Sequence, residues 1–335
     1  MEKVDFKKLN EIIYDYIDYL RIHNPLFLYN VEFFYELHKP NKDFSLNRVE
    51  YIPIKMNALD TFKLVKDFYE IYHKGELKTI EELFNDGIFN IYYLDELKDE
   101  QIYIDDNEHR FRQSYRNGVC SINLPLEGNI NDFAPVIHEI RHQLNCPNEG
   151  RSLENDMLTE ALSIFDEIIG LDFLGESIEK DEPNKIKQNY ISYLVNEFGY
   201  VYFISKLVNL KERLGYINIE NYNMLYAGEK FNDKAANNCD YICEKLKTFK
   251  NIKADEVSQY TFGVFLSLFM YDKYKQDNSY LDKVKKLNMA LKNNENIAAC
   301  LRLVDINLED ENVIDELRKN LINELKLFKE NVKTM

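Results

Sequence analysis

The stretch DFAPVIHEIRHQL, residues 132–144, decides how this chain is interpreted. It places His138 and His142 four residues apart, with Glu139 directly after the first histidine. In an α-helix, side chains at positions i and i+4 project from one face a turn apart, so the two imidazoles can share a tetrahedral zinc ion. The stretch therefore predicts a helix that binds zinc through His138 and His142, with Glu139 placed to act on a water at the metal.

The borders of this helix can also be read from the sequence. Asn131 or Asp132 can cap its first turn, and Pro135 falls where a missing N–H does no harm. Cys146 and Pro147 mark its end. Because many helices carry a HExxH pattern without binding metal, the surrounding sequence has to supply the rest of a site.

A catalytic zinc ion needs a third protein ligand and one open position. The segment LTEALSIFDEII, residues 158–169, follows His142 after one loop and has an apolar helical face. Its polar stripe consists of Asp156, Glu160, Ser163 and Glu167. This stripe is either a solvated acidic face or part of a returning helix that aims Glu160 at the two imidazoles as third ligand. In the second case Glu167, seven residues on, can accept a hydrogen bond from a ligand imidazole.

Composition excludes several classes of protein. The 335 residues include 42 Lys and Arg against 58 Asp and Glu, a formal net charge of −16. Such an acidic surface repels phosphate backbones and anionic lipid, so neither a nucleic acid nor a membrane is expected as partner. Hydrophobic residues make up 45% of the chain, which suits a folded core and is too high for a disordered acidic chain.

Helix dominates the rest of the sequence, because apolar residues recur at spacings of three and four. The middle differs: residues 88–94, 101–104 and 118–126 are short, β-branched or aromatic runs bounded by turn residues, which indicates strands. Residues 256–274 are almost wholly apolar and aromatic, which predicts a buried central helix. The expected fold class is mainly α with a small β-sheet (α+β).

The predicted location is the cytoplasm. Charges interrupt every apolar run near the N-terminus, so no cleavable signal sequence is expected. No stretch reaches the roughly 18 uncharged apolar residues that a membrane helix needs. Five Cys, an odd number, fit a reducing compartment. The remaining candidates for metal ligands are better explained as packing, surface or satisfied residues: Cys239, Cys243, His23, His38, His73 and His109.

Around the predicted zinc helix the sequence resembles the thimet oligopeptidase and oligoendopeptidase F family of HExxH zinc metallopeptidases. Residues 132–144 are similar to the family's aspartate-led helix that ends in HExGH. Residues 158–167 are similar to its glutamate-ligand helix, in which a second glutamate follows seven residues after the first, as Glu167 follows Glu160. Less specific similarity covers residues 57–72, 117–125, 258–274 and 280–310.

The resemblance implies a fold and a division of the chain. Residues 51–335 are expected to form a zincin-like metallopeptidase catalytic domain with a helical C-terminal lobe. Residues 1–50 are expected to form an N-terminal helical segment, which is shorter than the lobe that family members carry there.

The resemblance also implies an activity: a zinc-dependent peptidase that hydrolyses peptide bonds of short or unstructured peptides. One Zn²⁺ per chain would be held by the two histidines and Glu160. Glu139 would take the proton of the attacking water, and Tyr260 would donate a hydrogen bond to the oxyanion. A peptide substrate is the expected partner, and residues 119–123 are the expected place for it to pair as an added strand.

Three departures from the family pattern favour an alternative. Arg141 stands at the glycine of HExGH, so a long cation is expected beside the metal. No histidine follows His142, although the family places one shortly before its tyrosine helix, and Glu256 stands at a second tyrosine position. The alternative is a catalytically weak or inactive protein of this fold that acts as a peptide-binding module.

Overall fold

The computed structural model describes residues 52–93, 112–116, 119–145, 153–178, 182–187, 189–191, 194, 254–293, 295–307 and 310. For residues 112–116, 119–121, 153–156 and 254–262 the backbone alone is described. The chain divides into two compact units, and nearly all of the described residues belong to the unit formed by Val49–Tyr190 and Gly263–Ile306. The division into residues 1–50 and 51–335 stays a prediction.

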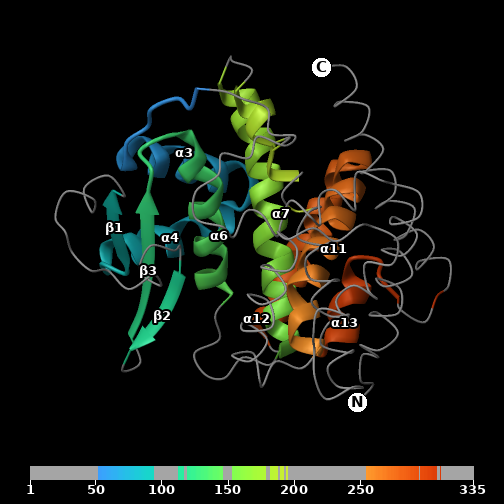
Figure 1. The fold of residues 1–335 in the computed structure, drawn as a ribbon. Coiled ribbons are helices and arrows are strands. Elements are labelled where there is room, and N and C mark those ends of the chain that lie inside the picture. Colours follow the sequence, from blue (N-terminus) through green and yellow to red (C-terminus); the bar gives the residue numbers. More distant parts are fainter. Residues whose placement is uncertain are drawn as a thin grey trace, which may run out of the picture. The chain divides into compact units, whose positions relative to one another are not determined.

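A three-stranded sheet forms one part of this unit (Figure 1). Its strands are β1 (Phe89–Tyr93), β2 (Arg112–Arg116) and β3 (Val119–Leu126), in the order β1-β3-β2. β1 pairs in parallel with β3, from Phe89 opposite Ile122 to Tyr93 opposite Leu126. β2 pairs antiparallel with β3, from Arg116 opposite Val119 to Arg112 opposite Asn123. Two of the three predicted strands are present, β2 was not predicted, and residues 101–104 lie outside the described residues.

β3 is the central strand of the three. Residues 119–123, the expected place for a peptide to pair, are bonded to β2 along one edge, and Ile122 and Asn123 are also paired with β1 along the other. Pairing of a peptide with these residues stays a prediction. β2 was missed because its sequence, RQSYR, has neither the β-branched residues nor the alternation that marks a half-buried strand. Its place in the sheet depends on pairing with β3, which a local pattern does not encode.

Helices make up most of the described chain, which confirms the mainly helical class with a small sheet. The helices of the described residues include α3 (Ala58–Tyr72), η1 (Lys74–Glu76), α4 (Leu77–Asn85), η2 (Ile130–Asp132), α6 (Phe133–Leu144), α7 (Leu153–Ser177), α11 (Ala254–Gln276), η3 (Asn278–Tyr280), α12 (Leu281–Lys292) and α13 (Ile297–Leu303). Among the described residues, no helix has the length and apolar character needed to cross a membrane.

Asp132 joins the end of β3 to the start of α6. Its carboxylate accepts hydrogen bonds from the backbone N–H groups of Glu127, Gly128 and Asn129, at 2.8, 2.9 and 3.1 Å. Asp132 stands at the predicted N-cap position of α6, but its side chain binds the preceding loop and caps no N–H of α6. The single turn of η2, capped by Asn129, explains this, because it already places Asp132 in helical conformation.

The core of the unit lies between α6, α7 and α3. In Figure 1, α6 lies between the sheet and α7. The helices are held by fully buried apolar side chains, each of which contributes about 1.5–3 kcal/mol when removed from water. These include Phe68 on α3, Ile137 and Ile140 on α6, and Phe165 and Ile168 on α7. Packing this dense sets the separation of α6 and α7, and therefore the position of the polar residues that they carry.

Candidate metal centre

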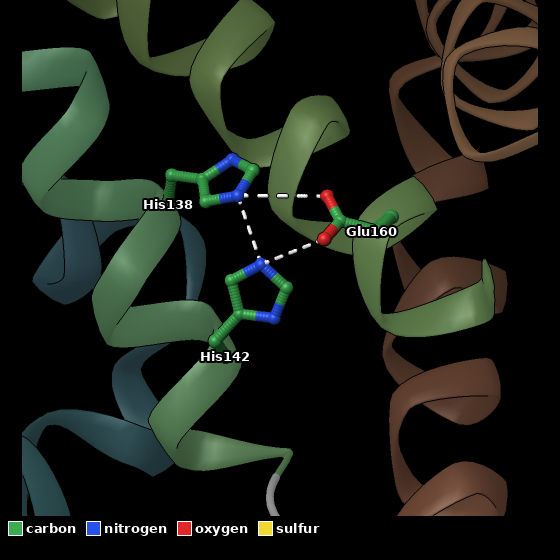
Figure 2. A group of neighbouring side chains, drawn as sticks. All are labelled: His138, His142 and Glu160. Atoms are coloured by element: carbon green, nitrogen blue, oxygen red, sulfur yellow. Dashed lines mark hydrogen bonds and ion pairs between the residues drawn. The ribbon is translucent and has the colours of Figure 1, made fainter. Parts of the chain in front are cut away.

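Three side chains from α6 and α7 point toward one another (Figure 2). His138 and His142 lie one turn apart on α6, and Glu160 faces them from α7. The two Nε2 atoms are 2.8 Å apart, and the Glu160 carboxylate oxygens lie 3.3 Å from His142 Nε2 and 3.6 Å from His138 Nε2. A tetrahedral ion at about 2.1 Å from each donor holds its donors about 3.4 Å apart. The group can therefore hold a metal ion.

A second carboxylate orients the first histidine. Glu167 Oε2 lies 3.1 Å from His138 Nδ1, on the side of the ring that faces away from His142. Occupation of Nδ1 by a carboxylate leaves Nε2 as the nitrogen for a metal and raises its basicity. Tyr190 donates its hydroxyl to the same Glu167 oxygen. The two glutamates of the stripe expected on α7 therefore occupy different positions: Glu160 lies beside Nε2 of both rings, and Glu167 lies behind the ring of His138.

The charges of the group favour a cation. Burial alone would lower the pKa of His138, but Glu167, Glu160 and Glu139 outweigh it and raise that pKa to about 10. In the metal-free protein the carboxylates therefore hold a proton on this imidazole, and a metal ion that binds there must displace it. The surplus of carboxylates over histidines makes the site suited to a divalent cation.

Glu139 lies between the two histidines in sequence and is only 8% exposed. Burial raises the pKa of its carboxyl group, the charges of His138 and His142 lower it, and those of Glu160 and Glu167 raise it again. The net direction is upward. A buried glutamate with a raised pKa suits a group that takes up and releases a proton.

Arg141 does not enter the candidate metal site, which corrects the expectation of a long cation there. Its side chain is 1% exposed and points into the core, where Nε donates to Asp166 Oδ2 at 2.6 Å and Nη1 donates to Glu76 Oε2 at 2.8 Å. Its guanidinium carbon also lies 5.7 Å from the centre of the Tyr69 ring. The reason is helical geometry: residue 141 lies about 100° around α6 from residue 142 and about 60° from residue 138, which turns it toward α3 and η1.

Asp166, on α7, belongs to the same buried group. Its second oxygen, Oδ1, lies 3.0 Å from His73 Nε2. Burial alone would raise the pKa of Asp166, but Arg141 and His73 outweigh it and lower that pKa. His73 is accordingly a satisfied buried histidine, as predicted.

Glu76 completes the buried group. Besides Arg141, it accepts hydrogen bonds from Asn288 Nδ2 at 2.8 Å and from Lys292 Nζ at 2.6 Å, both on α12. The sequence does not indicate that Glu76, Arg141 and Asp166 form one group, because they lie far apart in the chain. The sequence does contain one signal for a buried ion pair: Arg141 is a basic residue within the apolar face of its helix.

Tyr260 lies in α11, and its side chain is outside the described residues. Its expected hydrogen bond to the oxyanion therefore stays a prediction. The side chain of Glu256, which stands at the family's second tyrosine position, also lies outside the described residues.

Comparison with known proteins identifies the fold. No family model and no curated protein matches the chain. A solved structure of a Bacillus anthracis str. Ames protein assigned as an oligoendopeptidase F superposes on 95% of this chain with a TM-score of 0.62 and 10% identity. PZ peptidase A, solved with an inhibitor, superposes on 96% with a TM-score of 0.64 and 10% identity. The chain spans 56% and 58% of the length of these two proteins, and it shares their peptidase-like fold.

Proposed function

We propose that this protein is a zinc-dependent peptidase that hydrolyses short or unstructured peptides, with one Zn²⁺ per chain in a zincin-like catalytic domain. The observation that carries the proposal is the convergence of His138, His142 and Glu160 from two helices. The buried Glu139 directly follows His138 in sequence and interacts electrostatically with all three residues. Two imidazoles and one carboxylate are a donor set that zinc peptidases use, and they leave one position open. The fold shared with two solved structures, one assigned as an oligoendopeptidase F and one a PZ peptidase, supports the same reaction class.

Each residue has a defined task in this proposal. Bound zinc would polarise a water and the scissile carbonyl. Glu139 takes the proton of the attacking water and passes it to the leaving amine, for which a carboxyl group with a raised pKa is suited. Glu167 fixes the ring of His138 through Nδ1. Tyr260 is proposed to donate a hydrogen bond to the oxyanion.

A weaker activity, or peptide binding without cleavage, is the second candidate. It is favoured by one observation: no histidine follows His142, so the donor that the resembled family places before its tyrosine helix is missing. Loss of one oxyanion donor typically lowers kcat about a hundredfold to a thousandfold. Glu139 argues for the enzyme, because it contacts no metal in the proposal and has no other evident duty.

The test is cleavage of a mixed library of unstructured peptides by the zinc-loaded protein, read by mass spectrometry, with Glu139→Gln as the matched control. We expect new peptide termini with the wild type and a rate at least about a hundredfold lower with the variant, which keeps its zinc. A wild type that holds one zinc, binds peptides and cleaves none would favour the binding module. A wild type that holds no zinc would refute both forms of the proposal.

A further inference from the structure

Gly263 lies where α11 approaches α7. A Cβ atom built on Gly263 would be 2.7 Å from Cβ of Glu160, 3.3 Å from the backbone N of Ala161 and 3.4 Å from the carbonyl carbon of Glu160. Cβ atoms in proteins essentially never approach another heavy atom to less than 3.0 Å. At this separation of the two helices, hydrogen is the only side chain that position 263 can carry.

The atoms that Gly263 approaches belong to the backbone and Cβ of Glu160, the proposed third ligand, and to the backbone of the next residue. They are the backbone of α7 and the first side-chain carbon of Glu160, so the crowding cannot be relieved by rotation of a flexible chain end. Any atom added at position 263 has to move either α11 or the carboxylate of Glu160. A glycine in the interior of a helix makes the helix less stable than an alanine would. A glycine at this position therefore indicates a close approach of two helices.

A metal site is sensitive to such a displacement. Ligand atoms have to lie within about 0.2 Å of their ideal distances, and a site that is loose by about 1 Å no longer functions. Neighbouring residues of α11 leave little room for adjustment, because Val264 and Ser267 are fully buried and Ser267 Oγ is already bonded to Val264 O at 2.7 Å.

We propose that Gly263 is a positioning residue: it allows α11 to lie directly against Glu160, and this contact holds the Glu160 carboxylate at the distance from His138 and His142 that zinc requires. The inference rests on the proposed zinc site. It concerns the residue that places the third ligand, and it requires nothing from Tyr260.

Two other glycines, both on α7, provide matched controls. A Cβ at Gly170 would be 2.9 Å from Ile137 Cδ1, the far end of a flexible side chain, and 3.3 Å from Phe133 Cε1, and within 4 Å its three nearest atoms belong to none of the proposed ligands. A Cβ at Gly175 would come no closer than 3.7 Å to any atom, which is ordinary van der Waals contact. Gly170→Ala therefore crowds the core of the unit, Gly175→Ala crowds nothing, and Gly263→Ala crowds the ligand.

The experiment measures Zn²⁺ affinity by competition with a chelating dye for the wild type and for the three glycine-to-alanine variants, with the folded fraction of each followed by circular dichroism. The visible spectrum of the Co²⁺-loaded proteins reports the geometry of the site independently of activity. For folded Gly263→Ala we expect an affinity at least tenfold weaker and an altered Co²⁺ spectrum. Gly170→Ala and Gly175→Ala should stay within twofold of the wild type.

Three results would overturn the inference. The first is a folded Gly263→Ala with the zinc affinity and Co²⁺ spectrum of the wild type, and the second is an equal loss of affinity in Gly170→Ala, which would mark a general effect of crowding. The third concerns the case in which Gly263→Ala does not fold. That variant is then combined with Glu160→Gly, which removes the Cβ atom that the new alanine would meet. If the double variant also fails to fold, the contact is refuted, and if it folds, the contact is supported. Absence of zinc from the wild type would instead refute the proposed function itself.

Discussion

Both ring nitrogens of His138 have partners, and the partner of one nitrogen affects what the other can bind. Nε2 faces His142 and Glu160, while Nδ1 lies 3.1 Å from Glu167, which in turn accepts the hydroxyl of Tyr190. A carboxylate behind a ligand imidazole fixes its tautomer and orientation. The sequence allowed this arrangement to be proposed because Glu160 and Glu167 lie two helical turns apart on one stripe. The contact of Tyr190 with Glu167 could not be predicted, because nothing in the sequence around Tyr190 relates it to α7.

At the residue scale we expect Glu167→Ala to weaken zinc binding by about tenfold to a hundredfold, because the ring of His138 loses the group that orients it. The measurement is competition with a chelating dye at neutral pH. Glu176→Ala is the control, since Glu176 is an exposed residue near the end of the same helix and should leave the affinity unchanged. Equal affinities for Glu167→Ala and the wild type would exclude a role for Glu167 in the metal site.

At the scale of elements, the two helices that carry the proposed ligands are also joined by a buried ion pair. Arg141 comes directly before His142 on α6, and Asp166 comes directly before Glu167 on α7. The side chains of both are at most 2% exposed. Removing one partner of a buried ion pair leaves an uncompensated charge in the core, whereas removing both can be nearly neutral. The main effect of the pair is therefore on the relative position of α6 and α7, and its net contribution to the free energy of unfolding is small.

Arg141→Met is expected to lower the free energy of unfolding of the metal-free protein by about 3–5 kcal/mol, because Asp166 loses its main partner. The double variant Arg141→Met, Asp166→Asn should recover at least half of this loss, since the amide can still bond to His73. Urea unfolding measures both. Arg302→Met, at an exposed position of α13, is the control and should stay within about 0.5 kcal/mol of the wild type. Additive effects of the two substitutions would contradict the pairing.

At the scale of the whole compact unit, Glu76 ties together elements that are distant in sequence. It lies in η1 and bonds to Arg141 on α6 and to Asn288 and Lys292 on α12. Burial alone would raise the pKa of Glu76, but Arg141 and Lys292 outweigh it and lower that pKa from 4.5 to about 2. The folded unit therefore binds a proton at Glu76 less readily than the unfolded chain does.

The sign of this difference gives a pH dependence. A carboxyl group whose pKa is lowered by folding stabilises the protein fully above its unfolded pKa of 4.5, and this contribution is lost as the pH falls toward about 2. The difference corresponds to about 3 kcal/mol. We expect Glu76→Gln to be less stable than the wild type at pH 6, and the gap to narrow steadily between pH 5 and pH 3 in urea unfolding. Glu82→Gln, on the exposed face of α4, serves as control, and a gap that is independent of pH would refute the prediction.

The sequence by itself determined the helices of the candidate site and most of the sheet. The i, i+4 spacing of His138 and His142 sets their common face, and apolar periodicity indicates α3 and α7, because both depend on the regular geometry of a single helix. A nearly continuous apolar and aromatic run indicates α11. Two strands followed from β-branched and aromatic runs in the same way. These are local properties, which a few neighbouring residues decide.

Only the tertiary structure decided which groups meet. It turned Arg141 away from the candidate metal site and into a buried pair with Asp166, placed β2 beside β3, and brought Gly263 against Glu160. None of these contacts has a signature in local sequence, because each joins residues from different elements at a distance set by the packing of the core. The residues of a metal centre can be named from spacing, but the distances that let them act together are fixed by side chains far away in the chain.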